Sequence, residues 1–288
     1  MAQLTENVSR ARRVALTVRP TERFPVPQSD GYPLYGALLG VLDDADESVS
    51  QRVHDSPLGS LHNSGLQGAF GDSDRPHHKS IRPNETYEVT LGIVDPDDEA
   101  VFQALVKELV LEGSTLELTD GTLRVESFES ENATHEELLE RASEVDDPAV
   151  TIRFRTATCI EEADDVTTMF PHRVSVFRSL LNKWNRTAPD ALELELTRDA
   201  LRSSVIEKPN ARAYRTHSVL VNRVENDDSE TRNLFRQGFS GECTYAFKDA
   251  SESVQNAVVA LSLFGEYSGV GSAVARGCGN VEVTICDD

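Results

Sequence analysis

Four glycines occur within eleven residues near the C-terminal end of the sequence, at the spacing G-x-G-x5-G-x-G. Glycine adopts positive φ and lets another backbone approach closely, and successive turns of this kind direct N–H groups into one concavity that suits a phosphate. The spacing differs from that of a P-loop, and a dinucleotide-binding loop opens a helix, whereas this segment follows an expected helix and precedes an expected strand. The segment predicts either a phosphate-contacting loop or a tight helix-to-strand connection without a ligand. The glycines are Gly269, Gly271, Gly277 and Gly279.

Histidine is the side chain best suited to proton transfer, because its unperturbed pKa of about 6.5 lies near neutral pH. His54 follows an expected helix in the order Val53-His54-Asp55, and His62, in an expected strand, is the second choice of catalyst. A histidine at a helix C-terminus is also favourable for the helix dipole alone, so both interpretations of His54 stay open on chemistry. The histidines lack the i,i+4 spacing of a zinc site and the cysteines form no C-x2-C pair, so we expect no metal and no cofactor.

A local excess of positive charge runs from residue 198 to residue 223. Six cationic residues stand against two acidic ones over these 26 positions, in a sequence whose formal net charge is −21. Arginine suits phosphate because its planar guanidinium donates two parallel hydrogen bonds. The stretch either contacts phosphate or balances nearby acidic residues within the protein. The candidates for phosphate contact are Arg202, Lys208, Arg212 and Arg215.

The glycine segment resembles the C-terminal glycine-rich motif of the CRISPR-associated endoribonucleases that process repeat RNA, which are members of the RAMP superfamily. The resemblance rests on the aromatic approach F-G-E-Y-S-G-V-G-S at residues 264–272 and on the exit G-C-G-N-V-E-V at residues 277–283. Weaker similarity covers most of the chain, including the segment around His54. The resemblance implies that the loop contacts RNA through Gly269, Gly271, Ser272, Arg276, Gly277 and Gly279.

The resemblance also implies an activity and its partners. The protein is expected to cleave CRISPR precursor RNA within its repeats, without a metal ion, by attack of a 2′-OH on the neighbouring phosphate. The products would carry 5′-OH and 2′,3′-cyclic phosphate ends. His54 matches the family's catalytic histidine, but Leu39 stands where some members have a tyrosine, and no lysine occurs between His54 and Lys79. The alternative is a catalytically silent RAMP-type subunit that binds RNA within a guide-RNA complex, and in both cases the expected partners are CRISPR repeat RNA and the subunits of such a complex.

The apolar periodicity predicts an α+β fold in which the element order β-α-β-β-α-β occurs twice, as in two tandem ferredoxin-like (RRM-like) domains. We expect domains at residues 1–147, with His54, and 148–288, with the glycine segment. The first half has helices predicted at 36–53 and 97–112, and strands at 12–19, 60–70, 86–94 and 115–126. The second half has helices predicted at 174–184 and 253–267, and strands at 149–158, 192–197, 218–224, 238–247 and 280–285.

The acidic composition indicates an unusual solvent rather than a particular partner. Acidic residues outnumber basic ones by 49 to 28, they are spread over the chain, and only five of the basic residues are lysine. This pattern is typical of proteins from organisms with molar salt in the cytoplasm, where the Debye length is about 3 Å and net charge no longer repels RNA at a distance. We expect a cytoplasmic protein of a halophilic archaeon. The sequence shows no apolar run of membrane-spanning length and no signal segment, so no membrane partner is expected.

Overall fold

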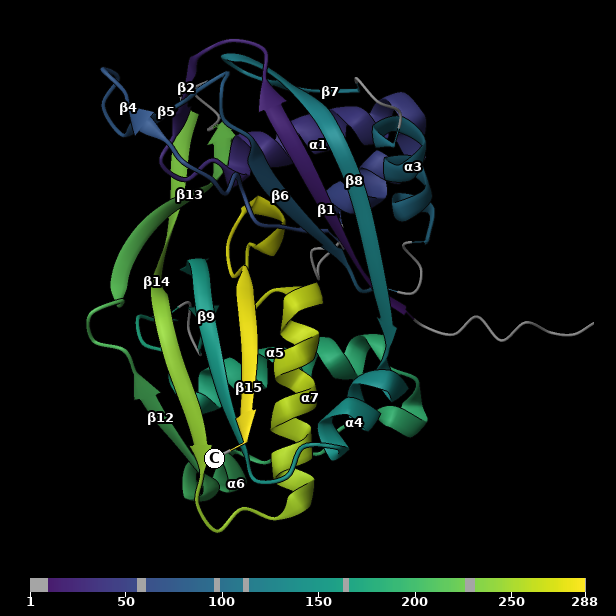
Figure 1. Cartoon of the computed structure of the whole chain (residues 1–288), viewed down its shortest axis with the longest axis vertical. Coiled ribbons are helices and arrows are strands. Elements are labelled where there is room, and N and C mark those ends of the chain that lie inside the picture. The colour runs from purple at the N-terminus through teal and green to yellow at the C-terminus, as the bar shows by residue number, and fades with distance from the viewer. Residues whose placement is uncertain are drawn as a thin grey trace, which may run out of the picture.

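The computed structural model describes residues 10–55, 61–95, 99–110, 114–162, 166–225 and 231–287. Over these residues the chain forms two α+β units arranged end to end along the long axis of the molecule (Figure 1). Each unit contains one main antiparallel sheet, with helices packed against one of its faces. None of the helices in this part of the chain is long and apolar enough to cross a membrane.

The first unit is organised around two long paired strands, β1 (Arg10–Pro20) and β8 (Gly121–Thr134). Val14, Leu16 and Val18 of β1 are buried, because alternate side chains of a strand point to the same face and here face the helices. The other elements are β2 (Phe24–Pro27), α1 (Gly31–Ala45), α2 (Glu47–Asp55), β3 (His62–Asn63), β4 (Gly71–Asp72), β5 (His78–Ile81), β6 (Tyr87–Ile93), α3 (Glu99–Leu109) and β7 (Thr115–Leu118).

The main strands of this unit lie in the order β3-β6-β1-β8-β7, and β2, β5 and β4 form a separate small sheet. When α2, the small sheet and the hairpin strand β7 are set aside, the chain order is β1-α1-β3-β6-α3-β8. This order, with β1 between β6 and β8, is that of a ferredoxin-like domain.

The second unit repeats the arrangement with longer strands. Its principal elements are β9 (Pro148–Thr158), α5 (Arg173–Thr187), β14 (Thr231–Phe247), α7 (Glu252–Ser268) and β15 (Val281–Asp287). The other elements are α4 (His135–Ser143), β10 (Ile160–Glu161), β11 (Thr167–Thr168), η3 (Asp190–Leu192), α6 (Arg198–Ser204), β12 (Val205–Pro209), β13 (Arg215–Glu225) and η4 (Val274–Arg276). The sheet order is β12-β14-β9-β15, and β13 pairs with the first half of β14. The prediction of two tandem ferredoxin-like domains is confirmed.

Each unit has its own hydrophobic core. Leu16, Leu38 and Leu105 belong to the first core, whereas Phe177 and Phe264 belong to the second. Helix α4 packs on α7 and adds its buried side chains to the second core. The domain boundary expected at residue 147 stays a prediction, and the helix that precedes this boundary packs with the second unit.

The helix predicted over residues 36–53 is two helices, and it begins earlier than expected. Helix α1 starts at Gly31 and ends at Asp46, whose N–H donates to the Leu42 carbonyl at 2.8 Å. The carboxylate of Asp46 then accepts hydrogen bonds from the Ser48 N–H and hydroxyl, at 2.9 and 2.6 Å. An aspartate that binds the N–H two residues later starts a new helix, which explains the break.

The strand predicted over residues 192–197 is wrong, and the edge strand of the second sheet is β12 instead. The alternation of leucines suggested a strand, but Asn185 of α5 binds this backbone. Its side-chain amide donates to the Leu194 carbonyl at 3.0 Å and accepts from the Leu194 N–H at 3.0 Å. Side chains of this type compete with strand partners for backbone groups, so the segment stays extended without joining the sheet.

Candidate functional site

The glycine loop, residues 269–279, connects α7 to β15 and folds back on itself. All four of its predicted glycines have positive φ, between 62° and 86°. The Val270 N–H donates to the Gly279 carbonyl at 2.8 Å, and the Gly279 N–H donates to the Ala157 carbonyl of β9 at 3.0 Å. The Ser272 N–H donates to the Cys159 carbonyl at 2.7 Å. Most N–H groups of the loop are therefore bound within the protein and are not free for a ligand.

The loop also joins the two units. A Cβ atom on Gly277 would lie 2.5 Å from the Cα of Gly31, the first residue of α1. The side-chain amide of Asn63, in β3, donates to the Ala275 carbonyl, and Ala275 is buried in the core of the first unit. The glycines at both sides of this contact are needed because two backbones meet there without room for a side chain.

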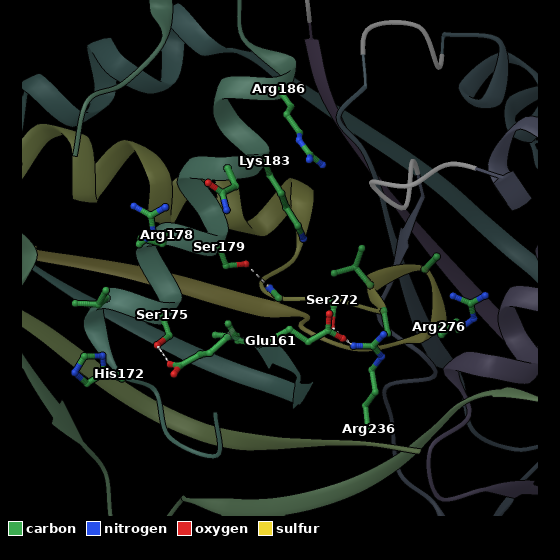
Figure 2. A pocket seen from close by; sticks show the side chains of 18 of the residues that line it. Glu161, His172, Ser175, Arg178, Ser179, Lys183, Arg186, Arg236, Ser272 and Arg276 are labelled. Atoms are coloured by element: carbon green, nitrogen blue, oxygen red, sulfur yellow. Dashed lines mark hydrogen bonds and ion pairs between the residues drawn. The ribbon is translucent and has the colours of Figure 1, made fainter. Parts of the chain in front are cut away.

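A cleft with a cavity volume of about 960 Å³ lies between α5 and the glycine loop (Figure 2). One wall is the polar face of α5, whose lining residues recur every three or four positions, as one face of a helix requires. The other wall is the loop from Gly271 to Arg276. Tyr35 of α1 and Val53 of α2 line the end contributed by the first unit. The residues in this wall are His172, which precedes α5, and Val174, Ser175, Arg178, Ser179, Asn182, Lys183 and Arg186 of α5.

The cleft is strongly cationic although the chain is acidic. Its described lining includes two acidic residues, Glu161 and Glu162. Glu161 forms an ion pair with Arg236, and Glu162 accepts a hydrogen bond from the Ser175 hydroxyl at 2.6 Å. The cationic lining residues are Arg178, Lys183, Arg186, Arg198, Arg202, Arg236 and Arg276. A concave surface with this excess of Arg and Lys suits a polyanion that carries phosphates.

Lys183 is the most buried of these cations. Its Nζ donates to the carbonyls of Ser268 and Gly269, at 3.0 and 2.8 Å, where α7 ends and the loop begins. These carbonyls lie at the negative end of the helix dipole, which favours a cation. Burial nevertheless lowers the pKa of Lys183 to about 7, because desolvation disfavours the charged form.

The predicted histidines differ in how the structure places them. His54 is in the last turn of α2, next to Val53, which lines the cleft, but its own side chain lies outside the described residues. His62 is 1% exposed, and burial lowers its pKa to about 3. Its ring packs against Gly269 and Gly92, away from the cleft lining. A buried ring with this pKa is poorly suited to exchange protons with a substrate, so the structure argues against the second choice.

Besides the cations of α5, the cleft lining contains a histidine and a tyrosine that were not among the predicted site residues. His172, at the N-terminus of α5, is the histidine that the described part of the chain places in the cleft, and its Nε2 lies 3.9 Å from a carboxylate oxygen of Glu207. Tyr35 lies one helical turn before Leu39, the position compared with the family tyrosine, and the Arg276 guanidinium lies 5.4 Å from its ring centroid. The spacing of four residues places Tyr35 and Leu39 on the same face of α1, which could be read from the sequence.

The predicted cationic stretch does not form one surface. Arg202, with Arg198, lines the cleft. Lys208 is exposed on β12, and it points away from α5 because the preceding Glu207 pairs with Arg173 of that helix. The Arg215 guanidinium donates to the carbonyls of Arg212 and Tyr214, at 2.9 and 2.7 Å.

Among the predicted loop residues, Gly271, Ser272 and Arg276 line the cleft, whereas Gly269, Gly277 and Gly279 are used in packing. The structure brings these three together with Arg202 and with the cations of α5. The pairing of the loop with α5 was not predicted, because residues about 90 positions apart in sequence meet there.

Comparisons with known proteins relate the second unit, which contributes both walls of the cleft, to one family. The family model described as CRISPR-associated endoribonuclease Cas6 matches residues 152–281, from β9 through α5 and the whole glycine loop to the start of β15. No curated protein matches the chain. The matches are to Cas6 and to Cas6-related RAMP proteins.

The solved structures that resemble the chain cover nearly all of it. A Cas6 product complex is 20% identical over 96% of this chain and 100% of that chain, with a TM-score of 0.67. Cas6 from Thermus thermophilus is 19% identical over 95% of this chain and 98% of that chain, with a TM-score of 0.62. A Cas6-related protein from Pyrococcus furiosus is 11% identical over 95% and 98%, with a TM-score of 0.60. At these identities the likeness establishes a common fold.

Proposed function

We propose that this protein is a metal-independent endoribonuclease that cuts CRISPR precursor RNA within its repeats and releases mature guide RNAs. The observation that carries the proposal is the cationic cleft, whose walls are α5 and the glycine loop, within the region that matches the Cas6 family model. Solved structures of the same fold include Cas6 complexes with product and with a substrate mimic. We further propose that the protein is located in the cytoplasm of a halophilic archaeon and associates with other subunits of a guide-RNA complex.

The reaction that we propose requires three kinds of group. A base removes the proton of a ribose 2′-OH, whose oxygen attacks the adjacent phosphorus. The bond from phosphorus to the 5′-oxygen breaks, and an acid protonates that oxygen, which leaves a 2′,3′-cyclic phosphate and a 5′-OH. Cationic donors stabilise the charge that develops on the phosphate oxygens. Each well-placed acid or base contributes a factor of about 10² to 10⁴ in rate.

His54 is our candidate for one proton-transfer step, because α2 ends at the cleft and its Val53 lines it. His172 is the candidate from the opposite wall. Tyr35 has a hydroxyl at the same end of the cleft as α2, and Arg276 lies beside it. The cations of α5 and α6 would hold the RNA backbone on either side of the scissile phosphate.

Single-turnover cleavage of the organism's own repeat RNA, in molar KCl, tests the proposal. His54→Ala should lower the cleavage rate by a factor of about 10² or more, with RNA affinity little changed. The wild-type protein should remain active in excess EDTA, and one 2′-deoxy substitution before the scissile phosphate should stop cleavage. His172→Ala is the matched variant on the other wall, and it shows whether a second histidine shares the proton transfers.

The outcomes separate the enzyme from its rival. Loss of activity on chelation, or full activity of His54→Ala, contradicts the assignment of His54 in a metal-independent reaction. Tight binding of the repeat by the wild-type protein without any cleavage would instead identify a catalytically silent RNA-binding subunit. One solved structure of this fold is described as a RAMP protein binding different RNA substrates, which is why this second function is retained.

A further inference from the structure

Two residues of α5, one helical turn apart, bind the start of the glycine loop. The Ser179 hydroxyl accepts a hydrogen bond from the Gly271 N–H at 2.9 Å. Lys183, four residues later, donates to the carbonyls of Ser268 and Gly269. Residues at this spacing lie on the same face of a helix, so α5 holds the loop by a donor and an acceptor together. Figure 2 shows the hydrogen bond of Ser179 as a dashed line, with Lys183 on the next turn of α5.

These contacts fix the point from which the second wall of the cleft starts. Gly269 has φ of 62° and begins the loop immediately after α7. The next residues, up to Arg276, include the Ser272 hydroxyl and the Arg276 guanidinium that line the cleft. Moving the Gly269 carbonyl would therefore move both side chains relative to α5.

The Lys183 ammonium is held by carbonyl dipoles and has no carboxylate partner among the described residues. Among the groups on the surrounding elements, His62 of β3 has its pKa lowered by burial and by the nearby charges of Lys183 and Arg13 of β1, so it is neutral between pH 6 and 8.5. Arg186 of α5 itself lines the same cleft. The acidic residues of the described cleft lining have other partners. Glu161 pairs with Arg236, and Glu162 accepts a hydrogen bond from the Ser175 hydroxyl at 2.6 Å.

We propose that Lys183 is a positioning residue for the cleft. Its ammonium ties α5 to the glycine loop, and a phosphate of the bound RNA supplies the negative charge that this ammonium lacks within the protein. This inference rests on the proposed RNA-binding function. A negative charge near a buried ammonium favours its protonated form. With a pKa near 7 in the free protein, binding of RNA takes up a proton, and RNA affinity falls as the pH rises from about 7 to 8.5.

The experiment measures the dissociation constant of a repeat RNA that carries a 2′-deoxy substitution at the cleavage site, between pH 6 and 8.5. In the wild-type protein the logarithm of the dissociation constant should rise by up to about one per pH unit above pH 7, as uptake of one proton requires. Lys183→Met should remove this additional slope and weaken binding at pH 6. Arg186→Met is the matched control, because it removes a lining cation of the same helix that does not bind the loop. It should weaken binding at every pH and keep the slope.

A second readout does not involve RNA. Hydrogen exchange at residues 269–276 should be faster in Lys183→Met than in the wild-type protein, and unchanged in Arg186→Met. Methionine is an unbranched, flexible side chain and needs no buried charge, so it is the substitution at this position that changes the packing least. If Lys183→Met does not fold, the Lys183 Nζ resonance of the wild-type protein is followed by NMR, and its titration midpoint should rise when RNA binds.

Three results would overturn the inference. The first is a pH slope that persists in Lys183→Met. The second is hydrogen exchange of the loop that this substitution leaves unchanged, and the third is an Nζ titration midpoint that does not move when RNA binds. A wild-type protein that binds no repeat RNA at any pH would instead contradict the proposed function, while the exchange measurement would still test whether Lys183 holds the loop.

Discussion

Arg178, Arg186 and Arg198 bring charge into the cleft without an ion pair or hydrogen bond to the rest of the described chain. Although the protein has 49 acidic residues, these three arginines pair with none of the described ones, so their charge remains available to an anionic ligand. Arginine keeps its charge at any physiological pH and hydrogen-bonds phosphate through two parallel N–H groups. Of the lining cations, these side chains are therefore the most directly available to the RNA of the proposed function.

The contribution of these arginines to RNA affinity can be measured from the salt dependence of binding. Arg178→Ala and Arg186→Ala should each weaken binding of single-stranded repeat RNA. Each should also reduce the slope of log affinity against log salt concentration by roughly 0.7, because fewer counterions are released on binding when one phosphate contact is missing. Lys208→Ala is the control, since Lys208 lies on β12 and points away from α5. Equal effects of all three substitutions would show that overall charge, and not the cleft, determines binding.

The sequence indicated that cationic residues and a glycine loop form the site, but it did not show which of the cationic residues lie together in the cleft. The excess of cations at residues 198–223 was visible, but only those on α6 line the cleft. Arg178, Lys183 and Arg186 were harder to predict, because a polar helix face is the ordinary solvent-exposed face until the opposing wall is known. That wall is the glycine loop, and its contact with α5 depends on the packing of the whole second unit.

At the scale of elements, the glycine loop lies between the helix and the strand that were predicted to flank it, and the RNA contacts expected of its glycines stay a prediction. The sequence alone left RNA contact and a tight connection open, and the hydrogen bonds of Val270, Ser272 and Gly279 favour the tight connection for most of the loop. Among the predicted loop residues, those that line the cleft are Gly271, Ser272 and Arg276.

Gly277→Ala should therefore lower the free energy of unfolding and leave the RNA affinity of the folded protein unchanged. The residue has φ of 86°, and its Cβ would lie 2.5 Å from the Cα of Gly31. The backbone strain alone is about 1–2 kcal/mol, and the overlap adds to it. Gly40→Ala is the control, because a Cβ there meets nothing within 4 Å inside helix α1. It should stabilise the protein by roughly 0.5–1 kcal/mol.

Thermal unfolding and RNA affinity are measured on the same two variants. An unchanged melting temperature for Gly277→Ala, with RNA affinity lost, would restore the interpretation that this glycine presents its backbone to RNA. A destabilised variant that binds RNA normally when folded would support packing as its role.

At the scale of the whole molecule, two histidines are buried in their neutral forms. Burial lowers the pKa of His62 to about 3 and that of His135 to about 4. His62 lies where the two units meet, and the ring of His135 packs against Trp184 in the second core, with its centroid 4.5 Å from the indole. Both pKa values lie below the ordinary value of about 6.5 that holds in the unfolded chain.

The free energy of unfolding should therefore fall as the pH decreases from 6.5 towards 4. In this window the unfolded chain binds more protons than the folded protein, so stability decreases as the pH falls. The contribution of His62 is about 2 kcal/mol at pH 5. Denaturant unfolding at pH 7.5 and pH 5 measures the effect, and His62→Leu should show a smaller difference between the two. An identical difference in wild type and variant would show that His62 is not buried in its neutral form.

The contact between Ala275 and the first core has a consequence for how the molecule comes apart. Ala275 is covalently part of the second unit but is buried with the side chains of the first. Separating the units would expose that methyl group, the paired glycines and the Asn63 amide together. Unfolding of either unit would therefore remove packing contacts from the other, and we expect the two to unfold cooperatively. The loop wall of the cleft is held by both units for as long as the protein stays folded.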